Sequence, residues 1–453
     1  MLLLRVYFAG FFLIMLRFII CVAAMAVAAP GFAQVTAKKY TNHTSPAIMD
    51  IQGMHVRESG FSGLIHIPGT ELEFYTISDR GFNLDSKKSK FSEGKEKILP
   101  YPNYCPKIHH IKLAGDSIQV LGTTTVKRPD GTDATGLPLP VGAGNTGEVI
   151  WGNMPTSKND IHVLGTDPWG VDPEGICMCA DNSFWICEEF GTSMWHLDAS
   201  GKVIMRYSPF GNADHQVGVD TALRYRRPNK GFEGIAIAPC GKVYGFVQST
   251  MAFPGSGVLD STRIMRILEV DPATNKTRMF AYVNDGTIIN GDDKIKPRDW
   301  EIGDAAAVND SEFLVIEHKA KKSISHLIIY KINIAHATPI TQDWVGGRTI
   351  EQYYDEAGLA SIGIKPVTKE LFMDLNKSGW DPKLAKTEDL AIVNDSTLVV
   401  GIDNDYGIES TPEGTVTSSG IDPIMYVFSL KGNSKIKNYV APPMLTNLQA
   451  QNK

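Results

Sequence analysis

The chain has 453 residues, of which 43% are hydrophobic and 21% charged, and this composition excludes wholesale disorder, collagen and coiled coil. The length is sufficient for one large domain or several small ones. The formal charge is −6, from 44 Lys and Arg against 50 Asp and Glu. A mildly acidic chain is a poor candidate for nucleic-acid binding, which depends on a positive surface, so we expect no nucleic-acid partner.

Residues 1–33 have the order of charged, apolar and small residues that is typical of an export signal. Arg5 and Arg17 are their only charges, an apolar stretch runs from Phe18 to Ala29, and small residues stand at 31 and 33. We therefore expect cleavage after residue 33, a periplasmic or extracellular protein, and no stable membrane insertion. A retained membrane anchor is the alternative. Starts at Met1 and at Met15 both remain open.

Without residues 1–33 the formal charge is −8, because Arg5 and Arg17 leave with them. The mature chain would keep five cysteines, and export permits disulfides. Cys177 and Cys179 are expected on one strand, with Cys187 on the next. Buried free thiols and one structural disulfide are both compatible with this pattern.

The rest of the chain predicts an all-β protein built from a degenerate repeat. Short β-branched and aromatic runs alternate with Gly, Asn, Asp and Pro turns, without a long helical periodicity. The unit is a small or acidic residue, an apolar strand, a polar turn, a second apolar strand and an acidic end. Five copies can be identified, at residues 61–81, 172–189, 231–248, 302–318 and 387–405.

Some of these hairpins are followed by a second strand pair, as at 194–197 with 203–207 and at 264–267 with 279–282. Four strands per unit, repeated along one chain, are typical of a β-propeller. Five blades are visible and we expect six, because the interval from 61 to 173 has room for a poorly matching blade. We expect residues 34–453 to form this single monomeric domain, closed by a strand near Met49 to Val56. A two-domain β-sandwich is the alternative.

The two ends of each predicted hairpin meet at one edge of the sheet and carry mostly acidic residues. The pairs are Ser62 with Asp79, Glu174 with Glu188, Glu233 with Gln248, Asp304 with Glu317, and Glu388 with Asp403, and Asp172, Glu189, Asp389 and Asp405 lie beside them. The innermost strands of a propeller line its axis, so these edges are expected to converge on one mouth of the central channel.

Crowded carboxylates repel one another, so some must protonate, pair with cations or bind metal, and hard oxygen ligands suit Ca²⁺. We expect metal ligands at Asp79, Glu174, Glu233, Asp304, Glu388, Asp403 and Asp405. We expect a catalytic set of Glu188, Glu317, His318, Arg80 and Arg227, the last from a basic run at 224–230 that could hold a phosphate-like group. The alternatives are that the acids only anchor backbone amides and that the basic run is a solvated loop.

The repeats resemble the phytase-like propeller family, whose description is esterase-like activity of phytase. The motifs that carry this resemblance are Ser78-Asp79-Arg80-Gly81, Asp172-Pro173-Glu174-Gly175, Gly231-Phe232-Glu233-Gly234, Leu314-Val315-Ile316-Glu317-His318, and Glu388-Asp389-Leu390 with Asp403-Asn404-Asp405. The likeness covers most of residues 50–430. Two positions depart from the family pattern, since His318 stands where Arg is usual and Asp389 where Gly is usual.

This resemblance implies an exported propeller that hydrolyses phosphate monoesters or related esters. Combined with the acidic mouth, it suggests a metal-assisted hydrolase of a small anionic ester, with Ca²⁺ held by the rim carboxylates and Arg80, Arg227 and His318 as counter-charges. The competing hypothesis is a non-enzymatic propeller that binds a ligand or an envelope partner, with calcium in a structural role.

Overall fold

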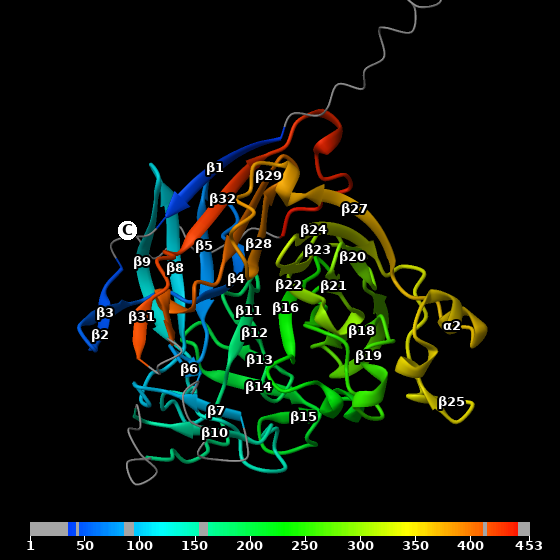
Figure 1. Cartoon of the computed structure of the whole chain (residues 1–453), viewed down its shortest axis with the longest axis horizontal. Coiled ribbons are helices and arrows are strands. Elements are labelled where there is room, and N and C mark those ends of the chain that lie inside the picture. The colour runs from blue at the N-terminus through cyan, green and yellow to red at the C-terminus, as the bar shows by residue number, and fades with distance from the viewer. Residues whose placement is uncertain (1–34, 42–44, 86–94, 154–161, 411–414, 443–453) are drawn as a thin grey trace, which may run out of the picture.

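The computed structural model describes residues 35–41, 45–85, 95–153, 162–410 and 415–442, and the expected export signal at 1–33 lies outside them (Figure 1). The fold is almost entirely β, with one short α-helix, α2 (Glu356–Ser361), and several 3₁₀ turns. Among the described residues, none of the helices has the length and apolar character needed to cross a bilayer.

Five blades of four main strands stand around one axis. Blade 1 contains β4 (Phe61–His66), β5 (Glu73–Ser78), β8 (Lys107–Ala114) and β9 (Ser117–Thr125). Blade 2 contains β11 (Pro173–Met178), β12 (Phe184–Glu188), β13 (Ser193–Leu197) and β14 (Val203–Ser208), with β15 (Gln216–Gly218) as a short addition. Blade 3 contains β16 (Phe232–Ile237), β17 (Val243–Val247), β18 (Ile264–Asp271) and β19 (Lys276–Val283).

Blades 4 and 5 complete the ring. Blade 4 contains β22 (Glu301–Ala307), β23 (Glu312–Lys321), β24 (Ile324–Asn333) and β27 (Thr368–Asp374). Blade 5 contains β28 (Thr387–Asn394), β29 (Thr397–Ile402), β32 (Ile424–Ser429) and, as its outermost strand, β1 (Thr36–Thr41). β1 pairs antiparallel with β32 over six residues, so the first described strand closes the last blade. Blades 1 and 5 are joined into one sheet where β1 meets β9.

The inner strands β4, β11, β16, β22 and β28 contact one another in a closed cycle and lie together at the middle of Figure 1. A separate hydrophobic cluster fills each of the five interfaces between neighbouring blades. β11 illustrates the consequence, since all six of its residues are buried: both of its faces are covered by adjacent blades. Burial on both faces explains why these strands read as continuous apolar runs.

The expectation of six blades is wrong for the part of the chain that the structure describes. The interval between blades 1 and 2 forms a small separate sheet of β6 (Leu84–Asp85), β7 (Lys95–Ile98) and β10 (Glu148–Trp151) on top of the ring. The segment near Met49 to Val56 also does not close the ring. It forms the hairpin of β2 (Ala47–Ile51) with β3 (Met54–Arg57), which packs with the small sheet and with the hairpin of β30 (Ile408–Ser410) and β31 (Val416–Ser418).

The remaining elements decorate blades 3 and 4. They are the hairpin of β20 (Ile288–Asn290) and β21 (Asp293–Ile295), the hairpin of β25 (Trp344–Val345) and β26 (Arg348–Thr349), α2, and 3₁₀ turns that include η2 (Thr221–Tyr225) and η4 (Pro297–Asp299). The five cysteines of the described chain are all free thiols. Cys177 lies opposite Trp185 and Cys187 lies opposite Gly175, so the pairing register of β11 and β12 does not bring the two sulfurs face to face.

The ring is tightest where Gly63 of β4 meets β11. A Cβ at Gly63 would lie 2.5 Å from the Gly175 Cα, and the residue has a φ of +75°. We expect Gly63→Ala to lower the free energy of unfolding by at least about 3 kcal/mol, from a left-handed backbone cost of about 1–2 kcal/mol and an overpacking cost of similar size. Urea denaturation measures this loss.

The matched control is Gly115→Ala, because Gly115 has a similar φ of +66° and nothing within 4 Å of its added Cβ. This variant isolates the backbone cost, so it should lose only about 1–2 kcal/mol. Equal losses in the two variants would show that the close approach of β4 and β11 is unimportant for stability.

Candidate functional site

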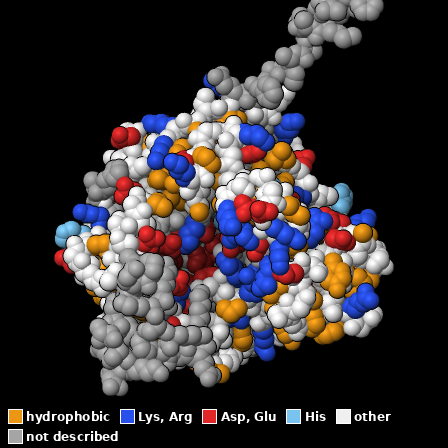
Figure 2. All heavy atoms as spheres, viewed as in Figure 1, with side chains coloured by type: hydrophobic (Ala, Val, Ile, Leu, Met, Phe, Trp, Pro, Cys, Tyr) orange, Lys and Arg blue, Asp and Glu red, His pale blue; other side chains and the backbone are white. Residues whose placement is uncertain are grey.

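An acidic hollow lies at one end of the central channel, where the second strands of the five blades end. Its volume is about 430 Å³, and Figure 2 shows its acidic side chains beside a field of Lys and Arg. Nine carboxyl side chains line it: Asp79, Asp172, Glu174, Glu189, Glu233, Glu301, Glu388, Asp403 and Asp405. Its basic and imidazole side chains are those of Arg80, Lys97, Lys230, Lys319, Lys386 and His318. We call this set of residues the mouth.

The first hairpin of every blade delivers three equivalent positions to the mouth. The first is a lead residue, whose backbone carbonyl faces the end of the second strand. The second is a middle residue, two positions after the lead residue. The third is an exit residue, at the end of the second strand. In blade 2 the Glu189 amide donates to the Asp172 carbonyl at 3.1 Å, and in blade 5 the Asp403 amide donates to the Lys386 carbonyl at 3.1 Å. The same geometry recurs in every blade, and we call each set a rim triplet.

The five rim triplets, in blade order, are Gly60/Ser62/Asp79, Asp172/Glu174/Glu189, Gly231/Glu233/Gln248, Glu301/Gly303/His318 and Lys386/Glu388/Asp403. In blades 2, 3 and 5 the residue two after the lead is itself the unpaired residue of a β-bulge, whereas in blade 1 the bulge follows it, at Gly63, and in blade 4 the register shift spans Gly303 and Asp304. A bulge redirects the side chains around it. In blades 2, 3 and 5 this middle residue and the exit residue both line the mouth.

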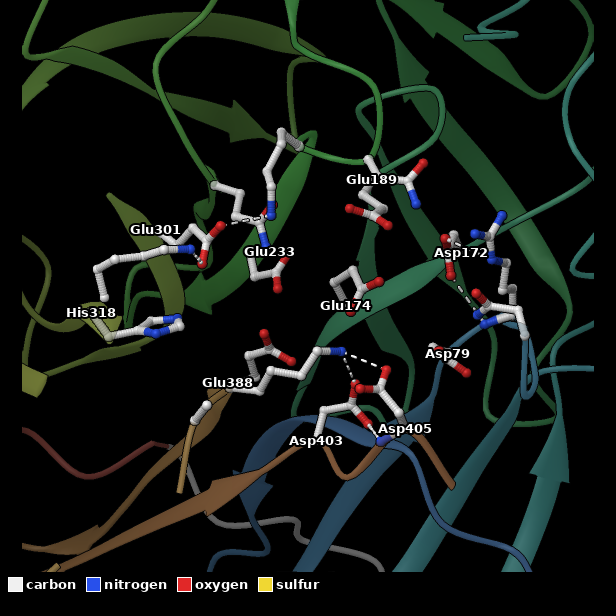
Figure 3. Close-up of a pocket in the computed structure, with 18 of the residues that line it drawn as sticks. Asp79, Asp172, Glu174, Glu189, Glu233, Glu301, His318, Glu388, Asp403 and Asp405 are labelled. Carbon is white, nitrogen blue, oxygen red and sulfur yellow. Dashed lines mark hydrogen bonds and ion pairs between the residues drawn. The ribbon is translucent and has the colours of Figure 1, made fainter. Parts of the chain in front are cut away.

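The blade 2 triplet is the one that consists entirely of carboxylates. Asp172, Glu174 and Glu189 each offer an oxygen within 4.8 Å of the other two, and all three side chains are buried (Figure 3). Burial raises the pKa of Glu174 well above its usual range, and the charges of Glu233 and Glu189 raise it further. Burial and the neighbouring Asp172 raise the pKa of Glu189 to about 8. The triplet therefore favours either protons or a cation at neutral pH.

Other acids around the mouth respond in the same way. Burial raises the pKa of Glu388 to about 7 and that of Glu233 well above its usual range. Glu233 is 2% exposed and its Oε2 atom has no hydrogen-bond partner. A buried carboxylate oxygen without a partner lowers the stability of the fold, so a cation or a hydrogen-bond donor bound at the mouth would be stabilising.

Two lysines neutralise part of this charge. Lys386 Nζ donates to Asp403 Oδ2 at 2.9 Å and to Asp405 Oδ1 at 2.6 Å. Lys230 Nζ lies 2.9 Å from Glu301 Oε1. His318 is buried, and burial lowers its pKa to about 4, so its imidazole is neutral at pH 7. His318 therefore contributes a polar nitrogen to the mouth, not the positive charge that the sequence suggested.

Arg80 lies under the mouth as a buried counter-ion. Its Nη1 donates to Glu148 Oε2 at 2.7 Å, its Nε lies 3.4 Å from Asp172 Oδ2, and its guanidinium packs over the Phe190 ring. The Arg80 amide also donates to Asp172 Oδ1 at 3.1 Å. Arg80 thus orients the Asp172 carboxylate.

Glu188 and Glu317 do not reach the mouth, although the sequence analysis placed both there. Glu188 pairs directly with Pro173 and turns into blade 2, where it accepts from the amides of Gly191 and Ser193 and from Ser193 Oγ. Glu317 turns outward and binds Lys369 Nζ at 2.6 Å, the Asp285 amide at 2.8 Å and the Tyr282 hydroxyl. Side chains alternate along a strand, so the neighbours Glu189 and His318 face the mouth instead.

Asp304 and Arg227 also lie elsewhere. Asp304 is one residue past its rim triplet and points into the ring, where it accepts from the Ala305 and Leu390 amides at 2.7 and 2.8 Å. Arg227 Nη1 donates to Ser249 Oγ and to the Arg298 carbonyl, so it fastens its loop to η4. Within the run 224–230 it is Lys230 that lines the mouth.

The remaining predicted metal ligands, Asp79, Glu174, Glu233, Glu388, Asp403 and Asp405, are brought together with Arg80 and His318 around the mouth. The sequence-based prediction did not include five residues of the mouth among its metal ligands and catalytic residues. They are Glu301, Lys230, Lys386, and the two members of the acidic triplet Asp172 and Glu189. The signal for four of these five was available, because aligning the repeats by their hairpin ends places Asp172, Glu301 and Lys386 at one position and Glu189 at another. Lys230 has no equivalent in the other repeats.

Glu188→Gln and Glu189→Gln form a matched pair that tests this geometry. Glu188→Gln should lower the free energy of unfolding by about 1–3 kcal/mol, since it disturbs a buried charged hydrogen-bond set, while Ca²⁺ affinity stays near that of the wild type. Glu189→Gln should weaken Ca²⁺ binding by about tenfold or more. Calorimetric titration and urea denaturation separate the two effects, and a loss of Ca²⁺ affinity confined to Glu188→Gln would contradict the placement.

Known proteins resemble this chain at the level of sequence. The phytase-like family profile, with the description esterase-like activity of phytase, matches residues 57–406. An uncharacterised secreted protein of Arthroderma benhamiae is 27% identical over 180 residues, which are 34% of this chain and 35% of that relative. The chain therefore spans about a third of that relative's length.

Similar solved structures include the PQQ-bound aldose sugar dehydrogenase of Streptomyces coelicolor, at 8% identity and a TM-score of 0.31 over 88% of this chain and all of that one. Another is streptogramin B lyase, at 11% identity and a TM-score of 0.31 over 88% and 98% of the two chains. Scores at this level carry no argument, so the propeller architecture rests on the strand pairing described above. Since the family profile spans most of the chain, the protein belongs to the phytase-like family.

Proposed function

We propose that this protein is an exported, divalent-cation-dependent hydrolase of phosphate or related esters, with its active site at the mouth. The observation that carries the proposal is the blade 2 triplet, where three buried carboxylates converge within 4.8 Å. The description of the relative as secreted and the order of residues 1–33 support export.

The residues present fit a calcium ion. Calcium takes oxygen ligands at about 2.3–2.6 Å, so two ligand atoms on opposite sides of one ion lie roughly 5 Å apart, and the separation in the blade 2 triplet falls within that limit. The unpartnered Oε2 of Glu233 is a further buried oxygen at the same hollow. Asp172, Glu174 and Glu189 would hold the ion, which when bound supplies Lewis acidity and lowers the pKa of its water.

The chain's own residues supply the rest of the site. Nine carboxyl side chains would repel an anionic ester, and a bound cation together with the Lys230 and Lys386 ammonium groups offsets that repulsion. Arg80 holds Asp172 in place through its amide and its Nε atom. Asn83 and Lys97, from the segments that follow the first hairpin of blade 1, also line the hollow.

A second candidate is a binding protein in which calcium only rigidifies the mouth. Some rim carboxylates accept from backbone amides, as Asp79 does from Gly81 at 2.9 Å and Asp403 from Asp405 at 2.8 Å. Such contacts are what a purely structural acid makes. The two candidates differ in turnover, not in cation binding.

The test is an ester panel assayed on purified residues 34–453 with Ca²⁺ or with EGTA. Phosphate monoesters, phosphate diesters and carboxylic esters should be compared, and we expect Ca²⁺-dependent turnover of at least one class. Asp172→Asn and Glu174→Gln should lower kcat/KM by about 100-fold or more, since even indirect ligand partners are worth about 10- to 100-fold. Asp395→Asn is the control, because Asp395 pairs with Lys435 on an exposed turn.

Turnover that is equal in Ca²⁺ and EGTA would contradict the proposed role of the cation. A Ca²⁺-dependent rise in Tm without hydrolysis of any ester would favour the binding protein.

The pKa values also predict how stability depends on pH. Glu388 and Glu189 titrate near 7 and 8 in the folded protein, above the ordinary value of 4.5, so the folded state holds more protons than the unfolded state between these limits. The unfolding free energy of the cation-free protein should therefore fall as pH rises from about 5 to 8, by up to about 1.4 kcal/mol per pH unit and group. Tm measured in EGTA at pH 6 and 8.5 checks this.

Saturating Ca²⁺ should reduce that decline, because the cation replaces the protons and binds more tightly as pH rises. A Tm in EGTA that rises from pH 6 to 8.5 would contradict the assigned protonation.

A further inference from the structure

The rim triplets of blades 2 and 5 occupy equivalent places but differ in charge at one position. Blade 2 has Asp172, Glu174 and Glu189, whereas blade 5 has Lys386, Glu388 and Asp403. The equivalence is fixed by the backbone, because the exit amide donates to the lead carbonyl at 3.1 Å in both blades and the bulge follows the first strand residue in both. The middle and exit positions are thus acidic in both blades. The lead position has a carboxylate in blade 2 and an ammonium in blade 5.

The Lys386 ammonium does in blade 5 what a bound cation would do. Its Nζ atom contacts Asp403 Oδ2 and Asp405 Oδ1, at 2.9 and 2.6 Å, and Figure 3 shows these two carboxylates close together. Asp403 is buried, and it lies near Asp79 of blade 1, whose pKa is raised well above its usual range by burial and by the charge of Asp403. Without the ammonium, these carboxylates would face one another with no counter-charge.

Blade 2 has no such lysine in its triplet. Arg80 contacts Asp172 from beneath, yet it also pairs with Glu148. The charges of Lys230 and Arg80 offset only part of the effect of burial and of Asp172 on Glu189, whose pKa stays raised. The unpartnered Glu233 Oε2 faces the same hollow and is an independent sign that a positive ligand is wanted there.

We propose that the blade 5 triplet is a second copy of the blade 2 cation site whose cation is built into the chain as the Lys386 ammonium. This inference rests on the cation of the proposed function. It has two consequences: the mouth binds one divalent ion and not two, and an anionic ligand in the mouth meets a divalent ion on one side and a fixed ammonium on the other.

The test counts calcium ions by calorimetric titration and native mass spectrometry, with Ca²⁺ as the only added ligand. The wild type should bind one equivalent. Lys386→Asp gives blade 5 a triplet of three carboxylates, as in blade 2, and should bind two equivalents. Asp172→Asn should weaken the single wild-type site by at least about tenfold, and Lys386→Asp combined with Asp172→Asn should keep one tight site.

Lys386→Met keeps the test decisive if Lys386→Asp does not fold. In EGTA the methionine variant should melt at a lower temperature than the wild type, because Asp403 and Asp405 lose their counter-charge. Its Ca²⁺-induced rise in Tm should exceed that of the wild type. The matched control is Lys435→Met, which removes a lysine from an exposed pair with Asp395.

Two equivalents in the wild type, one equivalent in folded Lys386→Asp, or equal Ca²⁺-induced Tm shifts in Lys386→Met and wild type would each overturn the inference. These outcomes are separate from the fate of the proposed function. A wild type that binds one ion and hydrolyses no ester contradicts the hydrolase and leaves the lysine assignment intact, whereas a wild type that binds two ions and hydrolyses esters does the reverse.

Discussion

The carboxylate of Asp304 is the contact on which the ring depends, because it joins several blades at a single point on the axis. It accepts from the amides of Ala305 and Leu390, and the amides of Leu64 and Ile235 also lower its pKa. Strands β22, β28, β4 and β16 are therefore tied to one side chain. Burial nevertheless raises the pKa of Asp304 well above its ordinary range, so its amide donors only partly offset the loss of water.

The mouth follows from how tightly the ring closes around Asp304. Glycines at 63, 175 and 234 let the inner strands approach, and in blades 2, 3 and 5 a bulge at the middle residue of the triplet lets that residue line the mouth. The packing of the inner strands thus fixes the positions of the acidic side chains, and their mutual repulsion is a consequence of the fold. Fixed ammonium groups and a cation can relieve that repulsion, and protonation relieves it when neither is present.

The sequence was sufficient to predict the all-β class, the propeller and all five first hairpins, because each hairpin is a local apolar pattern with its own turn. Blade number was not predictable in the same way. Residues 84–151 contain strand-like runs such as Lys95–Ile98, and the pattern alone does not say whether such a run joins the ring or lies above it. The choice depends on long-range packing against Tyr406 and Trp151.

For two of the predicted catalytic residues the prediction was wrong by one position, and that single position matters. Counting acids at strand ends selected Glu188 and Glu317, whereas the side chains at the mouth belong to Glu189 and His318. Successive side chains of a strand point in opposite directions. An error of one residue therefore selects a side chain that points into the blade and not into the mouth. Without knowledge of the bulges and the strand register, a sequence can show which segment contains the site residues. It cannot show which side chains of that segment face the site.

The pairing of β1 with β32 has a consequence for how the molecule is made. The two strands lie near opposite ends of the described chain. β1 is synthesised early, but it cannot become the outermost strand of blade 5 until residues 424–429, which form β32, have been synthesised. Until then β29 has an open edge, and β1 has only its short parallel pairing with β9. Closure of so large a loop carries an entropic cost, and contacts so distant in sequence form slowly. Throughout that interval the growing chain carries unpaired strand edges, which makes assistance from a chaperone most valuable just before the last blade is complete.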